Sequence, residues 1–366
     1  MARKKQNGGL TVLTKKQLSS VMINAIILKM IMTFPRNIFM ICGNSAWMAG
    51  IAATAVSFGL FCLIKWLYCA KSNVIDISYK LGGVMLRTIT GLCVFLVLSL
   101  NFISILRIFP EIIHLVLLQK TYVEFITAAF VITVIYGSWC GIEAIARVHQ
   151  IFIPIAGVVF ASFIIMLLPD IKGGNLLPIF GNGTVSLIKG SLFVMSIFSD
   201  LLMLNILIPF AKDPDDWKGA GNKSIIIGGV CAILIFLAYG MCYAYPASSE
   251  FIVPIYQLER LINLSDFFSR LETVFQFIWS ISILLYSSMY LAVLGETWRE
   301  SFGLHHTKPL CAPITIALVG VALLPDSLND AIFWDGAINR WVYIPAFAIP
   351  VIIGALFHVK QFKTTR

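Results

Sequence analysis

Two ionisable side chains interrupt long apolar stretches of this sequence and could carry chemistry inside a membrane. Lys29 lies near the middle of residues 18–42, and Asp200 lies in the middle of residues 185–210. A charged side chain at the centre of a bilayer costs about 2.5–3.5 kcal/mol on insertion scales, so such groups face the protein interior and mark a ligand, an ion partner or a pathway. Lys29 and Asp200 are therefore the first candidates for a functional site.

Polar side chains recur with helical spacing beside these two ions. The 3.6-residue period of an α-helix places residues three, four and seven apart on one face. Four such stripes are formed by Lys29, Thr33 and Arg36; by Asn101, Ser104 and Glu111; by Ser196 and Asp200; and by Thr273, Gln276, Ser280 and Ser287. They indicate either a polar cavity or hydrogen bonds between helices. We expect Lys29, Thr33, Asn101, Ser196, Asp200, Gln276 and Ser287 to bind a ligand between helices one, three, six and eight.

The composition places these stripes in an all-α integral membrane protein. Of the 366 residues, 59% are hydrophobic and 12% are charged, whereas soluble domains are about 45–50% apolar. The net charge of +9 comes from basic residues in loops and tails rather than from one patch. The positive-inside rule accounts for this distribution, so we expect a lipid bilayer and no nucleic acid as partner.

About ten runs of the sequence are long and apolar enough to cross a membrane. They cover residues 18–42, 46–69, 84–109, 123–140, 149–169, 185–210, 224–245, 270–295, 310–325 and 341–359. The basic N-terminal tail precedes no small-residue cleavage site, so we expect the first helix to stay in the protein. The excess of Lys and Arg in alternate loops predicts that both termini are cytoplasmic.

Ten spans form two sets of five, and because five is odd the second set begins on the opposite side of the membrane. This is the arithmetic of an inverted-topology repeat, in which the first helix of each half is discontinuous and the substrate lies at the break. We expect residues 1–366 to form a single transmembrane domain, with repeats at about 15–169 and 185–360. Helices one and six are then equivalent, and each carries one ion, of opposite sign.

Lys29 and Asp200 allow two interpretations. A zwitterionic amino acid could bind between them, its carboxylate on the lysine and its ammonium group on the aspartate. Alternatively, the two side chains pair with each other and gate the bundle, and the ligand is uncharged.

Other kinds of site receive little support from the sequence. The eight cysteines have no CxxC or Cys/His spacing, so we expect neither disulfides nor a metal site. His305 and His306 lie in a loop, and no carboxylate or cysteine constellation surrounds His114 or His149. We expect no enzyme and no cofactor.

Several short motifs resemble one known family through their order and spacing. They are Leu13-Thr14-Lys15-Lys16-Gln17, Phe34-Pro35-Arg36, Trp47, Arg107 with Glu111, residues 141–147 (GIEAIAR), residues 177–183 (LPIFGNG), Pro254, Ser269-Arg270-Leu271-Glu272, Trp279 and Leu324-Pro325-Asp326. Over essentially the whole chain they resemble the B subunits of GerA-type spore germinant receptors, also called endospore germination permeases.

This resemblance implies a LeuT-type fold of the amino acid-polyamine-organocation superfamily, in the spore inner membrane. It also implies recognition of a small-molecule germinant, such as an amino acid, in a complex with A and C subunits. The charged motifs, together with a proline and a glycine beside them, are interpreted as structural or gating anchors. These residues are Pro35, Arg36, Arg107, Glu111, Gly141, Glu143, Arg147, Arg270 and Glu272.

The sequence departs from this family where the two ions lie. Members usually have small residues around the break in helix one, where this chain has Leu28-Lys29-Met30. Helix six has Leu201 and Met203 where a Gly and a Glu are expected. Because glycine lets backbone approach a ligand, these departures put a backbone-bound carboxylate in doubt. Lys29 could supply the missing positive charge instead; equally, the ligand could differ, or this copy could sense poorly.

Hypotheses of different classes follow. The chain is a germinant-sensing receptor subunit, or an autonomous secondary transporter of amino acids or related organic cations. A third hypothesis is a scaffold or an ion and water conduit whose ligand binds elsewhere.

Overall fold

The computed structural model describes residues 12–68, 72–262 and 271–364, with residues 271–272 and 362–364 described by their backbone alone. In these parts the regular elements are helices joined by loops and turns. The helices of the first half are α1 Lys15–Ile31, α2 Phe34–Cys42, α3 Ala46–Leu67, α4 Val74–Val116, α5 Val123–Cys140 and α6 Ile142–Met166. Those of the second half are α7 Thr184–Val194, α8 Leu201–Leu207, α9 Asp216–Cys242, α10 Pro254–Leu261, α11 Leu271–Phe302, α12 Lys308–Ala322, α13 Leu328–Trp341 and α14 Tyr343–Thr364.

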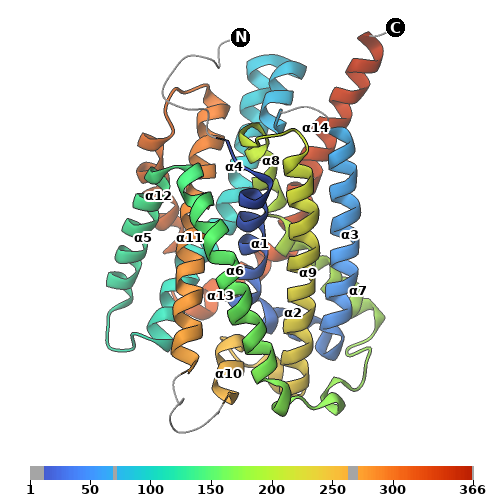
Figure 1. Cartoon of the computed structure of the whole chain (residues 1–366), viewed down its shortest axis with the longest axis vertical. Coiled ribbons are helices and arrows are strands. Elements are labelled where there is room, and N and C mark those ends of the chain that lie inside the picture. Colours follow the sequence, from blue (N-terminus) through green and yellow to red (C-terminus); the bar gives the residue numbers. More distant parts are fainter. Residues whose placement is uncertain (1–11, 69–71, 263–270, 365–366) are drawn as a thin grey trace.

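By length and composition, 8 stretches of described helix could cross a membrane. Two of the ten expected spans consist of helices that are too short to be counted on their own among these 8 stretches. The first is split into α1, with 17 residues, and α2, with 9, and the ninth is α12, with 15. The described chain begins and ends at the same end of the bundle (Figure 1).

Both helices that were expected to be discontinuous are interrupted. The first span breaks at Met32, whose ψ of −122° is not helical, and α2 resumes with Pro35 in its first turn. The sixth span passes from α7 through a 3₁₀ turn at Met195–Phe198 to a turn at Ser199 and Asp200 before α8 begins.

The helices pack in two groups whose contacts come in matching pairs. In one group α1 lies against α9 and α3 lies against α7; in the other, α4 lies against α12 and α5 lies against α11. In an inverted repeat each span of the first half corresponds to the span five later. This correspondence converts the contact of α1 with α9 into that of α7 with α3, and the contact of α4 with α12 into that of α11 with α5. This pattern is that of the expected inverted repeat, whose exact residue limits remain a prediction.

Two expected boundaries were wrong, and a third was right but incomplete. The long helix of the third span starts after a kink at Gly82 and Gly83, near the expected residue 84, and a further helical segment that begins at Val74 and is capped by the Asn73 side chain precedes the kink. The fifth begins at Ile142 rather than residue 149. The connection from Asp326 to Arg340 contains helix α13, which packs against α4 and α7.

The contact between α1 and α9 depends on a glycine. A Cβ at Gly228 would collide with Ile26, which is buried on α1. A β-branched side chain in a helix has one strongly preferred rotamer, so Ile26 cannot easily make room.

We therefore expect Gly228→Ala to destabilise the protein by about 1–3 kcal/mol, the usual cost of overpacking. Gly320→Ala on α12 is the matched control, because a Cβ there meets nothing within 4 Å; it should be neutral or stabilising by up to about 1 kcal/mol. Thermal unfolding of the purified protein in detergent measures both. Equal effects of the two changes would contradict this packing.

Candidate functional site

Lys29 and Asp200 meet at the interrupted parts of the first and sixth spans. The Lys29 Nζ atom lies 3.2 Å from Asp200 Oδ1, and their side chains are 11% and 0% exposed. The lysine is close to the end of α1, and the aspartate directly precedes α8. The two ions predicted to be equivalent by symmetry are therefore an ion pair in this structure.

The lysine ammonium group has further acceptors. Its Nζ atom lies 2.9 Å from Ser199 Oγ, 3.1 Å from the Ser196 carbonyl oxygen and 3.4 Å from Asn101 Oδ1. Asn101 Nδ2 in turn donates to Ser199 Oγ at 3.2 Å. With Asp200, the ammonium group thus has four acceptors for its three protons, so its hydrogen-bonding capacity is filled by the protein.

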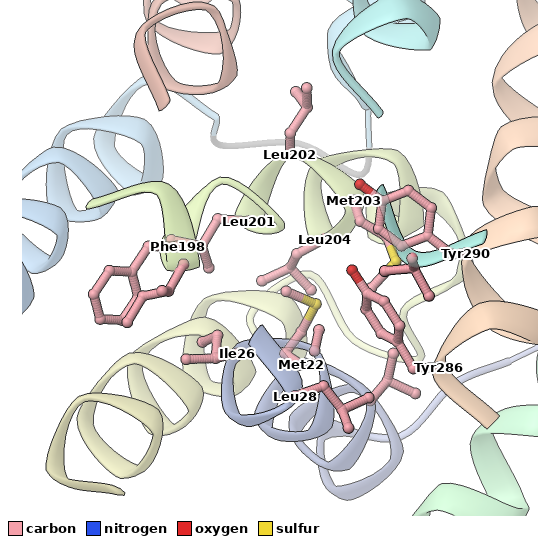
Figure 2. Packing of buried hydrophobic residues seen from close by; sticks show 14 of the residues in the cluster. Met22, Ile26, Leu28, Phe198, Leu201, Leu202, Met203, Leu204, Tyr286 and Tyr290 are labelled. Carbon is pink, nitrogen blue, oxygen red and sulfur yellow. The ribbon is translucent and has the colours of Figure 1, made fainter. Parts of the chain in front are cut away.

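Two tyrosines that the sequence reasoning missed complete the surroundings of Asp200. Tyr286 donates its hydroxyl to Asp200 Oδ2 at 2.8 Å, and Tyr290 donates to Oδ1 at 3.3 Å. Figure 2 shows both rings between α11 and the buried side chains of α1 and α8. Their spacing of four residues in mid-span was the available signal, because tyrosine usually lies at membrane interfaces and a buried hydroxyl needs a partner.

A second carboxylate lies close to this cluster. Thr33 Oγ1 donates to Asp335 Oδ2 on α13 at 3.3 Å. A cavity of about 30 Å³ adjoins it, lined by Lys29, Met32, Thr33, Phe34, Asn101, Ser104, Ile105, Ile108, Asp335 and Asn339. This volume is enough for about one water molecule. Asp335 was also missed, because its segment was interpreted as a loop.

The remaining expected ligand residues differ in where they lie. Ser196 contributes its carbonyl oxygen to Lys29, and its buried hydroxyl has no hydrogen-bond partner among the described residues, as is also true of Ser287. Gln276 is elsewhere: its amide donates to Glu259 of α10 at 2.6 Å. Gln276 is also ten residues before Tyr286, which corresponds to about 15 Å along a helix. Asp200 is thus contacted by Tyr286 and Tyr290 of α11, and not by the predicted stripe of polar residues to which Gln276 belongs.

The expected structural or gating residues are dispersed around the bundle. Arg107 and Glu111 form an ion pair of 2.8 Å on α4, and Glu143 pairs with Arg147 on α6. Arg36 donates to the Ser249 carbonyl oxygen at 3.3 Å.

The backbone anchors and the last charged motif complete this set. Pro35 lies in the first turn of α2, and Gly141 precedes α6 with a φ of 93° that favours glycine. Arg270 and the side chain of Glu272 lie outside the described residues.

A larger, mostly apolar cavity of about 260 Å³ lies between α1, α6, α9 and α11. Asn24 is on its wall and is held by Ser282 and His149: its Nδ2 atom lies 3.0 Å from the Ser282 carbonyl oxygen and 3.2 Å from His149 Nε2. None of the residues of the Lys29 cluster lines this cavity.

Comparison with known proteins was made with the whole sequence. A family model described as "Spore germination protein" matches residues 12–331. Spore germination protein B2 of Bacillus subtilis (strain 168) is 23% identical over 359 residues, which are 94% of this chain and 94% of that protein. Spore germination protein KB of the same organism is 22% identical over 339 residues, 88% of this chain and 90% of that protein.

Solved structures show the fold of the chain. MhsT in complex with L-phenylalanine has a TM-score of 0.66 at 14% identity, over 96% of this chain and 90% of its own. Mhp1, a nucleobase-cation-symport-1 family transporter in a closed conformation with bromovinylhydantoin bound, has a TM-score of 0.60 at 12% identity, over 98% and 96%. Both are LeuT-fold transporters, so the expected LeuT-like fold is confirmed.

If Lys29 and Asp200 stabilise the fold as a pair, removing one partner should cost more than removing both. We expect Lys29→Met or Asp200→Leu alone to destabilise by about 3–5 kcal/mol, because each leaves an uncompensated buried charge, and the double variant to recover much of this loss. Thermal unfolding of the four proteins measures it. A double variant as unstable as the sum of both singles would argue against direct pairing.

The tyrosine contacts give a separate prediction. Tyr286→Phe should destabilise by about 1.5–3 kcal/mol, because a hydrogen bond to a charged acceptor is lost. Tyr136→Phe is the control, since this side chain is 68% exposed on α5 and should change the stability by less than about 0.5 kcal/mol. Similar melting temperatures for both variants would show that the Tyr286 contact contributes little.

Proposed function

Because this chain belongs to the family of spore germination proteins, we propose that it is the membrane-embedded subunit of a spore germination receptor that recognises the germinant. The ligand is a small solute, such as an amino acid, bound where helices one, three, six and eight meet. The protein resides in the spore inner membrane with both termini on the core side, and acts together with A and C subunits.

The observation that carries this proposal is the buried cluster around Lys29 and Asp200. It lies at the interruptions of the first and sixth spans, and a LeuT-like inverted repeat places its ligand at such breaks. Polar groups from α4 and α11 converge on it as well, through Asn101, Tyr286 and Tyr290. Intramembrane ions gathered from several helices are costly unless they are used.

Transport of a small solute is the second candidate. The solved structures of similar fold are named as a transporter with bromovinylhydantoin bound and as a complex with L-phenylalanine. A transporter would act alone, whereas a receptor must pass its state to another subunit. Adjacent A and C subunit genes expressed during sporulation would favour the receptor, and a lone vegetative gene would favour the transporter.

Germination of spores that carry single variants tests the receptor. Lys29→Ala and Asp200→Ala should each abolish the response to a germinant found by screening amino acids and related solutes on wild-type spores. Lys172→Ala is the matched control, since this lysine is exposed in a loop, and it should respond like the wild type. The amount of each variant in spore membranes is measured in parallel, and wild-type sensitivity of an assembled Lys29→Ala protein would contradict the proposed site.

A further inference from the structure

Asp335 is a second carboxylate beside the Lys29 and Asp200 pair, and it lines a small cavity. It accepts a hydrogen bond from Thr33, and the side chains of Ser104 and Asn339 also hydrogen-bond to its carboxylate. It lines the small cavity together with Lys29, and the residue is only partly buried. Both α2 and α13 lie in the half of the bundle farther from the termini (Figure 1).

The charges around this cavity do not balance. Lys29 and Asp200 neutralise each other at 3.2 Å, and Asp335 adds a second negative charge. The cationic side chains on the neighbouring parts of α2 and α4 are directed elsewhere, with Arg36 on the Ser249 carbonyl oxygen and Arg107 on Glu111. Lys29 is the one cation among the residues that line the cavity. The partners of the Asp335 carboxylate are neutral hydrogen-bond groups, and Lys29 is shared with Asp200. Burying a charge without an opposite charge of its own is costly, so a further positive charge at this place is favourable.

A ligand carboxylate has no comparable partner. The lysine ammonium group is already held by Asn101, the Ser196 carbonyl oxygen, Ser199 and Asp200. A zwitterion would therefore have to displace one of these acceptors, and it would leave the net charge of the cluster unchanged at minus one. A cation without a carboxylate corrects the charge and requires no such displacement.

The walls of the cavity match a small organic cation. Oxygen atoms of Thr33, Ser104 and Asp335 provide acceptors, and Met32 and Phe34 provide apolar surface. The volume of about 30 Å³ restricts the ligand to the smallest members of the class unless the walls move.

We propose that this site takes a small primary amine, whose ammonium group binds to Asp335, rather than a zwitterionic amino acid. The proposal rests on the proposed function, since it assigns the chemical class of ligand to that same site, and it replaces the amino acid given there as an example with an amine that carries no carboxylate. It differs from the sequence-based hypothesis in both the anchoring residue and the charge of the ligand.

Three matched probes test the proposal on the purified full-length protein. Methylamine carries only the ammonium group, glycine carries the ammonium group and a carboxylate, and acetate carries only the carboxylate. We expect methylamine hydrochloride to raise the melting temperature with saturation, and glycine and sodium acetate at equal concentration to leave it unchanged. Potassium chloride at equal ionic strength controls for screening.

The variant Asp335→Asn should weaken the methylamine effect by about tenfold or more, because it removes the charged acceptor. Asp326→Asn is the matched control, since this carboxylate is exposed just before α13, and it should keep the wild-type half-saturating concentration. If Asp335→Asn does not fold, Thr33→Val provides a second variant that removes a neighbouring acceptor and should weaken the effect in the same direction.

Three results would overturn the proposal: stabilisation by glycine but not by methylamine, no stabilisation by methylamine, or an Asp335→Asn protein with wild-type affinity. Sodium chloride that abolishes the methylamine effect when potassium chloride does not would also overturn it, by identifying an inorganic ion site. These binding measurements are independent of germination. A protein that binds methylamine and yet supports no germinant response would refute the receptor and leave the ligand class intact.

Discussion

The buried ion pair of Lys29 and Asp200 is the interaction on which the interior of this protein depends. Neither charge could stay at this depth alone, because taking an ion out of water costs several kcal/mol even after the protein relaxes. Their partners come from both groups of helices. Lys29 reaches Asn101 on α4, and Asp200 receives the hydroxyl groups of Tyr286 and Tyr290 on α11. The cluster therefore connects the group that contains α1 and α8 to the group that contains α4 and α11.

The same cluster includes a backbone group at the interruption of the sixth span. An interrupted helix leaves backbone groups unpaired, and inside a membrane such groups must find partners within the protein. Here the Ser196 carbonyl oxygen accepts from the backbone N–H and the hydroxyl group of Ser199, and also from Lys29. The lysine side chain thus adds a charged contact to a turn whose backbone is already paired. Where the resemblance predicts small residues, Leu28-Lys29-Met30 places a charged side chain against this turn.

On the proposed function, the contacts of Lys29 limit what this site can recognise. The Lys29 ammonium group already has four acceptors and offers little to a ligand carboxylate, whereas Asp335 lines a small cavity in which Lys29 is the one cation. The position of α13 decides this property, because it brings Asp335 to Thr33 at the start of α2. The large apolar cavity beside α1 and α6 contains none of these charges and is a separate feature of the bundle.

The sequence by itself determined the class of protein, the approximate spans, the two intramembrane ions and the interruption of the helices that carry them. These features follow from hydropathy and from the cost of burying charge, which are local properties of each segment. Only the tertiary structure decided which faces meet. Gln276 lies on the predicted stripe of its helix but contacts Glu259, while Tyr286 and Tyr290 reach Asp200. Periodicity shows which residues share a face, whereas the rotation and axial position of that face are set by packing against other helices. The same holds for α13, a short helix whose stability comes from tertiary contacts rather than from its own propensity.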